Sequence, residues 1–433
     1  MAHASERLPE PTSEATHLRN WLQISAAAAL AAPAPVLRAL DITGIVDLHL
    51  ASGVESAIFG LSILAAATLL VWATEVAEQL ISATLALAVL AIIAVLPEYA
   101  VDLYFAWTAP DNPENAQFAL ANMTGANRLL IGFAWPVVFF LFWLRSRRRD
   151  LPVGNTNAVG LVFLGVATIY SFSIPLRQHL SLIDSGALIG LFLVYLVLSS
   201  RAPPREAELV GPARTIGALP LSLRWAVVVG IFAYAAGTVF SAAEPFAEGL
   251  VASGESLGVE QFLLVQWVAP LASEAPEFIL AAMLALRGRA GAGMTLLISS
   301  KVNQWTLLVG SLPVAYSISG QTFSPLDMDA RQAEEVFLTA AQSLFAVAVL
   351  TSLSFSAREA TLIFLMFSLQ FFVPIPAVRL GFGAAYILLA VLWFVSERSQ
   401  IPALFRTARR ALETAPAGSP SGPAGRAGDP EET

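Results

Sequence analysis

Two glutamates placed within apolar segments are the strongest candidates for chemistry in this chain. Glu98 belongs to the segment LPEYAVDLYFAW, residues 96–107, and Glu277 belongs to APEFILAAMLAL, residues 275–286. An ionisable side chain at the centre of a bilayer costs about 2.5–3.5 kcal/mol or more unless it is paired or hydrated. Two such residues in matching sequence contexts are therefore best explained as paired ligands.

Each of these glutamates follows a proline, which changes the backbone beside it. Proline inside a helix removes one hydrogen bond and clashes with the preceding turn, so the helix kinks or unwinds. The freed carbonyl oxygens then face the interior of the helix bundle. Together with the carboxylate they offer the oxygen ligands that bind small hard cations.

Two further ionisable residues are predicted in the same interior. Asp102 lies one helical turn after Glu98, so both can face one cavity; pairing with Arg128, or a position near the outer interface, is the alternative. Lys301 is the only lysine, against 23 arginines, and falls within an apolar segment. A buried ammonium beside carboxylates can exchange protons with them, or it can form a static ion pair that only stabilises packing.

The elements that carry these residues are predicted to be membrane-spanning helices. Of the 433 residues, 56% are hydrophobic and 13% are charged, whereas soluble domains carry about 25% charged residues. Apolar blocks of roughly 20 residues cross the hydrocarbon core as helices. We predict twelve spans, near residues 22–40, 55–78, 81–107, 117–144, 155–173, 184–199, 222–246, 258–286, 292–318, 334–354, 358–375 and 378–396.

The composition argues against several other classes of protein. The absence of cysteine excludes disulfides, thiol catalysis and zinc–thiolate sites, and the four histidines are scattered. No nucleophile elbow, phosphate loop or catalytic metal cluster is visible, so we do not expect an enzyme or a cofactor. The basic run RSRRR at 145–149 is explained by membrane orientation, so nucleic acid is not an expected partner.

The arginines predict the orientation. With the N-terminus in the cytoplasm and spans alternating, eighteen loop and tail arginines fall inside, and four, Arg38, Arg177, Arg331 and Arg379, fall outside. Because cytoplasmic loops carry the basic excess, both termini are predicted to be cytoplasmic in a multi-pass plasma (inner) membrane protein. The first eighteen residues are polar with no basic region leading into an apolar stretch, so a cleaved signal peptide is not expected.

The two Pro-Glu segments belong to an internal repeat. With five spans in each half, the two copies enter the membrane from opposite sides, which is an inverted-topology repeat. Each copy continues into a helix rich in small residues, ANMTGAN at 121–127 and TLLISSK at 295–301. Small residues let helices approach closely, either around a cation or in ordinary packing.

These segments resemble the motifs of the sodium/calcium exchanger (cation/calcium antiporter) superfamily, of which the chain looks like a divergent bacterial-type member. Each family repeat carries a Gly-Thr-Ser-Leu-Pro-Glu type motif and then a Gly-Asn-x-x-Gly-Ser-Asn type motif. The first motif is matched here by AVLPE at 94–98 and ASEAPE at 272–277, and the second by the two small-residue segments. The resemblance extends as topology over residues 55–376.

The resemblance implies an all-α integral membrane fold, a ten-helix inverted-repeat (5+5) core with one extra helix at each end. The implied organisation is a cytoplasmic tail at 1–21, an extra helix at 22–40, a first repeat at 55–199 with its motif region at 81–144, a cytoplasmic loop at 200–220, a second repeat at 221–376 with its motif region at 258–318, an extra helix at 377–397, and a cytoplasmic, largely disordered tail at 398–433.

The family's paired metal-binding glutamates correspond to Glu98 and Glu277. Further cation ligands are implied where the remaining family positions carry oxygen, although interhelical hydrogen bonding is an equal role for the amides; these residues are Ser273, Glu274, Asn127, Ser300 and Gln304. Lys301 and Asp102 are the implied proton-coupling or charge-replacing groups.

The sequence also departs from the family pattern. Ala94 and Val95 lack the hydroxyl groups that precede the first glutamate, and Lys301 replaces an asparagine that its counterpart Asn127 retains. The family's additional amide or carboxylate ligand falls on Gln304 in one repeat and on Leu130 in the other.

The implied function is secondary antiport by alternating access, exchanging Ca²⁺ or Na⁺ for Na⁺ or H⁺, with small cations and the bilayer as partners. Calcium takes about 6–8 oxygen ligands, so the missing hydroxyl groups and Lys301 favour an alternative, a Na⁺/H⁺-type exchanger that does not carry Ca²⁺. A cation channel is a weaker alternative, because paired carboxylates and a buried lysine favour tight, state-dependent binding over fast conduction.

Overall fold

The chain forms a bundle of membrane-length helices in the computed structural model, which describes residues 14–44, 51–77, 79–80, 96–199, 209–371 and 375–413. Within these ranges, eight helical stretches are long and apolar enough to cross a membrane, or up to nine if a bent helix counts as one span. The fold is that of an all-α integral membrane protein, as predicted.

The first half of the chain contains the following described helices. They are α1 (Glu14–Ala31) and α2 (Pro33–Ile42), which precede the predicted first repeat, and then α3 (Ser52–Ala77), α5 (Leu96–Thr108), α6 (Glu114–Leu129), the π-helical turn η1 (Leu130–Ala134), α7 (Trp135–Ser146), the 3-10 turn η2 (Asn155–Asn157), α8 (Ala158–Ser171), α9 (Ser173–Arg177) and α10 (Leu182–Ser199).

The second half supplies the remaining helices. They are α11 (Pro212–Gly217), α12 (Leu221–Leu257), α13 (Gln261–Leu286), α14 (Ala290–Asn303), the π-helical turn η3 (Gln304–Leu308), α15 (Val309–Ser319), α16 (Ala330–Leu350), α17 (Ala357–Phe371), α18 (Pro376–Ser396) and α19 (Gln400–Glu413).

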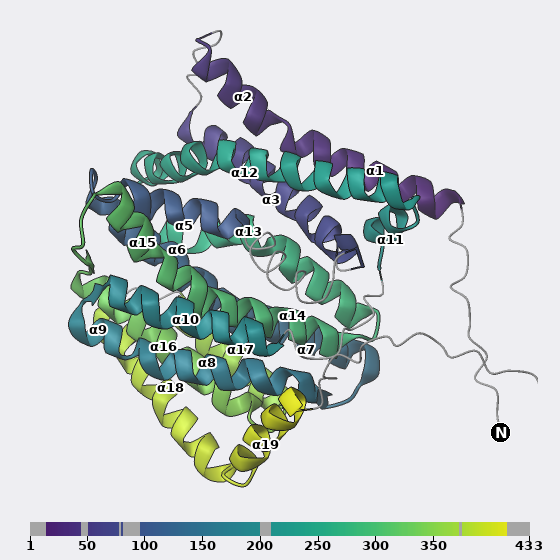
Figure 1. Cartoon of the computed structure of the whole chain (residues 1–433). Coiled ribbons are helices and arrows are strands. Elements are labelled where there is room, and N and C mark those ends of the chain that lie inside the picture. Colours follow the sequence, from purple (N-terminus) through teal and green to yellow (C-terminus); the bar gives the residue numbers. More distant parts are fainter. Residues whose placement is uncertain are drawn as a thin grey trace, which may run out of the picture.

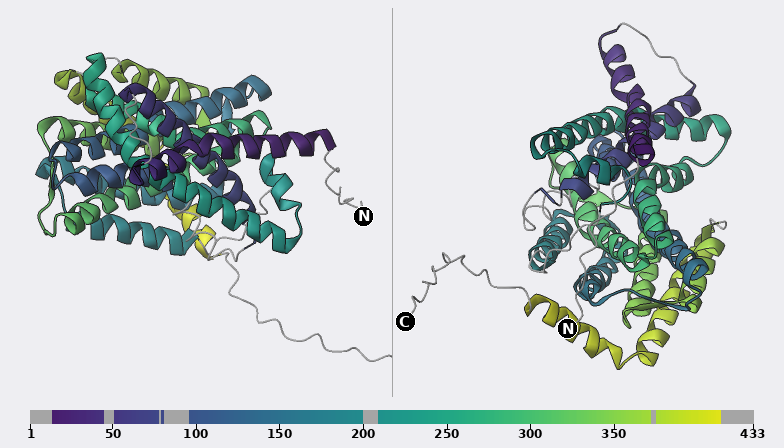
Figure 2. Two further views of the ribbon diagram at one scale, coloured as in Figure 1. Left: turned by 90° about the horizontal axis from the view of Figure 1, so that it is seen from above. Right: turned by 90° about the vertical axis from the view of Figure 1, so that its right-hand side faces the viewer.

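An outer layer of four helices covers one side of the bundle. Figure 1 shows α1, α2, α3 and α12 together along the top, with α18 and α19 at the bottom, and the right-hand view of Figure 2 separates α2 from α19 in the same way. Helices α1, α3, α11 and α12 bury an alanine-rich apolar cluster of their own. Other faces of α3 and α12 contribute to the larger cluster that the remaining helices share.

Equivalent π-helical turns interrupt one helix in each half. Helices α6 and α7 are joined by η1, and α14 and α15 are joined by η3, each a turn of five residues. The turns begin at Leu130 and Gln304, the two positions that the family motifs place in equivalent registers. Such turns widen a helix locally and often lie at functional sites.

Two short antiparallel ladders repeat the same symmetry. Strand β1 (Asp150–Pro152) pairs with β4 (Ser354–Ser356), and β2 (His179–Leu180) pairs with β3 (Leu326–Asp327). Helix α8 lies between β1 and β2 in the chain, so the ladders lie at opposite ends of the bundle. Strands β1 and β3 occupy equivalent positions in the two halves, and so do β2 and β4. The symmetry that relates the halves of an inverted repeat therefore also relates the two ladders.

Several boundaries differ from the prediction. Helix α12 continues to Leu257, beyond the predicted end at 246, and stops where Gly258 adopts the left-handed conformation (φ 64°). Residues 400–413, expected within a disordered tail, form α19, whose buried Leu404 and Ala408 lie on the side facing α8 and η2. Residues 81–95 of the predicted span 81–107 lie outside the described residues.

The second Pro-Glu segment bends α13. The stretches Gln261–Ala275 and Glu277–Leu286 meet at 56°, and the sequence places a proline between them. In the first copy, Pro97 is the second described residue of α5, and residues 81–95 before it lie outside the described part of the chain.

Helices α6 and α13 approach each other most closely at Gly125. A Cβ atom at this position would lie 1.8 Å from the backbone oxygen of Gln266. Only glycine allows this separation, so the contact between one helix of each repeat depends on it.

We predict that Gly125→Ala weakens the protein, because the new methyl group must push α6 and α13 apart. Overpacking of this kind costs about 1–3 kcal/mol, so the detergent-solubilised variant should melt several degrees lower. Gly190→Ala in α10 is the matched control, since a Cβ there meets no atom within 4 Å. Equal melting temperatures for the two variants would contradict the close approach.

Candidate functional site

Four carboxyl groups from both halves approach one another in the interior. Glu98 in α5 lies within electrostatic range of Glu274 and Glu277 in α13 and of Asp102 on its own helix. Asp102 is fully buried, and Glu98 and Glu274 are each 3% exposed. The bend in α13 and the first turn of α5 thus bring the two Pro-Glu segments to one place.

Gln304 lies between the two halves at the start of the π turn η3. Its Nε2 donates a hydrogen bond to Oε2 of Glu98 at 3.2 Å, and the same side chain approaches Glu274. The amide therefore connects a carboxylate of α5 with one of α13. Its counterpart Leu130 carries no polar group, so only one copy of the repeat provides this amide.

Lys301 is fully buried one helical turn before Gln304. Its Nζ donates to Oδ1 of Asn127 at 2.6 Å and lies 4.5 Å from the ring centroid of Trp305. No carboxylate oxygen of the described residues lies within ion-pair distance, yet Glu274 and Glu98 are its electrostatic partners. The ammonium is held by an asparagine and an aromatic face, close to the carboxyl groups.

Asp102 contacts an asparagine rather than an arginine. Nδ2 of Asn122 donates to Oδ1 of Asp102 at 2.9 Å, and both side chains are fully buried. The predicted alternative that Asp102 pairs with Arg128 is wrong, because Arg128 lies 2.6 Å from Glu335 instead. Tyr99, next to Glu98, donates to Oδ1 of Asn303 at 3.1 Å and links α5 to α14.

The two predicted serines lie beside the glutamates of α13. Ser273 donates to the carbonyl oxygen of Ala269, one turn earlier in its own helix, at 3.2 Å. Ser300 in α14 lies next to the carboxyl group of Glu277. Both hydroxyl groups remain able to offer an oxygen lone pair.

Oxygen atoms without hydrogen-bond partners are concentrated in this region. Buried acceptors normally find partners, and each exception calls for an explanation. Among the described residues, the unpartnered acceptor atoms here are Oε1 of Glu98, Oδ2 of Asp102, both carboxyl oxygens of Glu274, Oε2 of Glu277, Oδ1 of Asn122 and Oε1 of Gln304. A cation can interact with the lone pairs of such oxygens, and protons can bind to the carboxyl oxygens among them.

The described residues hold no group of three or more acidic or histidine side chains that is drawn together tightly enough to enclose a metal ion. The carboxyl groups instead lie within electrostatic range of one another, with the Gln304 amide beside Glu98 and Glu274 and the Ser300 hydroxyl beside Glu277. Clustered buried carboxylates repel one another unless positive charge lies among them. The arrangement therefore fits a reversibly bound cation.

Sequence reasoning missed several contacts of this site. No local sequence signal predicts the π turns or the contact of Lys301 with Trp305. The sequence does predict that Lys301 is buried, because it lies within an apolar segment. Arg128 falls within the predicted span 117–144, but no sequence pattern identifies Glu335, at the start of the predicted span 334–354, as its partner. The capping box of Asp329 and Gln332 starts α16 earlier, which places Glu335 inside the helix.

Comparison with known proteins supports the arrangement. The model of the family described as sodium/calcium exchanger protein matches residues 53–201 and 227–396. The crystal structure of the H⁺/Ca²⁺ exchanger CAX is similar over 92% of this chain and 99% of that chain, with TM-score 0.87 and 40% identity. No curated protein sequence matches the chain significantly.

Two other solved structures share the fold at low identity. Native YfkE is 16% identical, with TM-score 0.58, over 87% of this chain and 99% of its own. The sodium-calcium exchanger NCX_Mj is also 16% identical, with TM-score 0.50, over 73% of this chain and 97% of its own. Matches to both halves of the sequence and to the whole fold identify a transporter rather than an enzyme. The chain belongs to the sodium/calcium exchanger family of multi-pass cation antiporters.

Proposed function

We propose that the protein exchanges Ca²⁺ for H⁺ across the plasma membrane. The observation that carries this proposal is the set of unpartnered buried oxygens contributed by α5, α6, α13 and η3. Carboxylate, amide and hydroxyl oxygens are the ligands that Ca²⁺ prefers. The 40% identity to the H⁺/Ca²⁺ exchanger CAX favours H⁺ as the coupling ion.

Glu98 and Glu277 act as the shared ligands in this proposal, with Glu274 beside them. A bound cation draws the carboxylates together and relieves their repulsion. When the cation leaves, protons take its place on the carboxyl oxygens, so the site is neutralised by one kind of ligand or the other. Binding of Ca²⁺ and of H⁺ is thereby mutually exclusive, which is the requirement for antiport.

Gln304, Asn127, Ser273 and Ser300 complete the proposed ligand set. The Gln304 amide contacts Glu98 and approaches Glu274, so it fixes the position of the two carboxyl groups relative to each other. The serines add oxygens beside Glu277. Asp102 lies one turn from Glu98, in a position to pass protons to and from it. None of these roles requires a cofactor.

Alternating access is proposed to come from the outer layer. Helices α3 and α12 pack along each other, and with α1 they share a separate apolar cluster. Movement of this layer as one body would expose the carboxyl groups first to one end of the bundle and then to the other. In this proposal the repeats at 55–199 and 221–376 are the two related halves, and the arginine excess on one side, eighteen against four, favours cytoplasmic termini.

A monovalent cation/H⁺ exchanger is the second candidate, and Lys301 is the observation that favours it. An ammonium near the carboxylates reduces the negative charge available to a divalent ion. Gradients of Ca²⁺, Na⁺ and H⁺ applied to the same proteoliposomes distinguish the two functions. Calcium uptake driven by a pH gradient supports the first; Na⁺ flux without Ca²⁺ flux supports the second.

We predict that Glu98→Gln and Glu277→Gln each reduce pH-driven Ca²⁺ uptake at least about ten-fold, because a lost charged contact costs about 1.5–3 kcal/mol. The measurement is initial uptake into proteoliposomes with a fluorescent Ca²⁺ indicator. Glu255→Gln, at an exposed position in α12, is the control and should retain uptake. Wild-type rates in both site variants would refute the paired-glutamate mechanism.

We further predict that Lys301→Met changes the pH dependence of uptake. A nearby positive charge favours ionised carboxylates, so its loss makes the carboxylates bind protons more readily. The pH at which protons inhibit Ca²⁺ uptake should therefore rise by roughly one unit. Lys301→Arg keeps the charge and should restore part of the wild-type profile. If Lys301→Met melts lower but keeps the wild-type pH profile, the lysine serves packing alone.

A further inference from the structure

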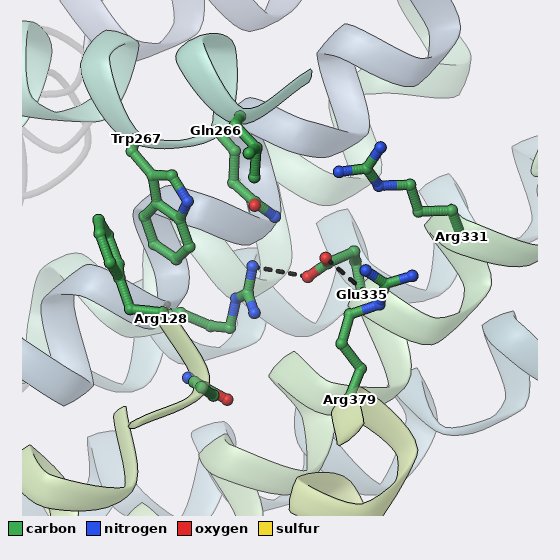
Figure 3. A pocket seen from close by; sticks show the side chains of 9 residues that line it. Arg128, Gln266, Trp267, Arg331, Glu335 and Arg379 are labelled. Carbon is green, nitrogen blue, oxygen red and sulfur yellow. Dashed lines mark ion pairs between the residues drawn. The ribbon is translucent and has the colours of Figure 1, made fainter. Parts of the chain in front are cut away.

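A second polar pocket lies on the side of α6 away from Lys301. Arg128 lines it from α6, Gln266 and Trp267 from α13, and Arg331 and Glu335 from α16, as Figure 3 shows. Arg379 of α18 and the last residues of α17 complete the lining; the enclosed cavity is about 20 Å³, room for little more than one water-sized group, and opens into a mouth that brings the empty space to about 280 Å³. None of its residues contributes to the carboxylate site.

Three arginines meet a single lining carboxylate in this pocket. In Figure 3 the guanidinium groups of Arg128 and Arg379 approach Glu335 from different sides, at 2.6 Å and 3.7 Å. Arg379 also lies 2.7 Å from Glu334. Arg331 is paired with Glu260, a partly exposed residue that does not line the pocket. The lining itself therefore carries more positive than negative charge.

The pocket also contains more hydrogen-bond donors than acceptors. Nε of Arg128, Nε of Arg331 and the side-chain amide nitrogens of Gln266 and Gln370 are buried without a hydrogen-bond partner, against one such amide oxygen, Oε1 of Gln370. Arg128, Gln266 and Gln370 are 3%, 1% and 7% exposed. Buried donors left unpaired cost about 1–3 kcal/mol each. A ligand with several anionic oxygens satisfies them at once.

The position of the pocket indicates where such a ligand comes from. Gln266, Arg331, Glu335 and Arg379 lie in the first two turns of their helices, so the pocket lies toward the end of the bundle where α13, α16 and α18 begin, and Arg128 reaches it from deeper, in the last turn of α6. Trp267 and Phe371 stack beside it, with ring centroids 4.6 Å apart. Aromatic residues at this level are typical of the membrane interface, where lipid headgroups lie.

The surface around the pocket is apolar. Large side chains of α13 and α17, the helices that supply Trp267 and Gln370, are exposed, namely Val268, Leu271 and Leu369, as is Ile375 at the N-cap of α18. Exposed apolar side chains on a membrane helix face acyl chains. A lipid whose tails cover these residues would bring its phosphate group to the arginines.

We propose that this pocket binds the phosphate of an anionic membrane lipid. The guanidinium groups of Arg128 and Arg331 and the amides of Gln266 and Gln370 supply the donors, because arginine forms paired, charge-assisted hydrogen bonds to phosphate. Glu335 holds Arg128 and Arg379 in place. The lipid joins α6 of the first repeat to α13, α16 and α17 of the second.

The test is native mass spectrometry of the full-length protein released from detergent. The probes are phosphatidylglycerol, phosphatidylcholine and inorganic phosphate, each added in excess. We expect one tightly retained phosphatidylglycerol in the wild type. The double variant Arg331→Gln/Gln370→Leu should bind it at least about ten-fold more weakly, since it loses charge-assisted contacts worth about 1.5–3 kcal/mol.

Arg177→Gln is the matched control. This arginine lies 2.5 Å from Asp184 outside the pocket, so its loss should leave lipid retention unchanged. Equal retention by the pocket variant and the control would overturn the proposal, as would retention of inorganic phosphate in place of lipid. Preference for phosphatidylglycerol over phosphatidylcholine, lost only in the pocket variant, would establish it.

Discussion

Mutual repulsion among buried carboxyl groups is the constraint on which the structure depends. Glu98, Glu274, Glu277 and Asp102 are brought together from both halves, in surroundings where charge is poorly screened. Such a cluster persists only if positive charge or protons reach it, and only if its supporting helices cannot drift apart. The close approach at Gly125 and the amide of Gln304 provide that support, from the backbone and from a side chain respectively.

The inverted repeat explains why the site is both symmetric and uneven. Its two halves contribute matching Pro-Glu segments, matching π turns and matching ladders. At equivalent positions of the two repeats, however, the residues differ. Lys301 in one copy corresponds to Asn127 in the other, and Gln304 corresponds to Leu130. The frame of the repeat therefore positions the glutamates, while the unequal residues give the two sides of the site different chemistry.

The helical fold and the two glutamates could be predicted from sequence, because lipid requires every backbone polar group within it to be hydrogen-bonded inside the protein. An apolar segment must be helical, and a glutamate within it needs a reason, which is why Glu98 and Glu277 were identifiable. The ends of helices were harder to predict. The span containing Glu335 is predicted to begin at residue 334, whereas the cap at Asp329 starts α16 at Ala330 and places Glu335 in its second turn. Contacts between distant segments, such as Lys301 with Asn127 or Arg128 with Glu335, depend on packing that no local pattern encodes.

The buried ammonium of Lys301 also bears on how the empty carrier responds to voltage. Moving one elementary charge across a membrane potential of about 100 mV requires about 2.3 kcal/mol. In the proposed mechanism the site stays in place while access changes from one end of the bundle to the other, so the membrane field acts on whatever net charge the site carries at that moment. The ammonium of Lys301, held among the same helices, would offset part of the negative charge of the carboxylates, and the change of access would then depend less on the potential.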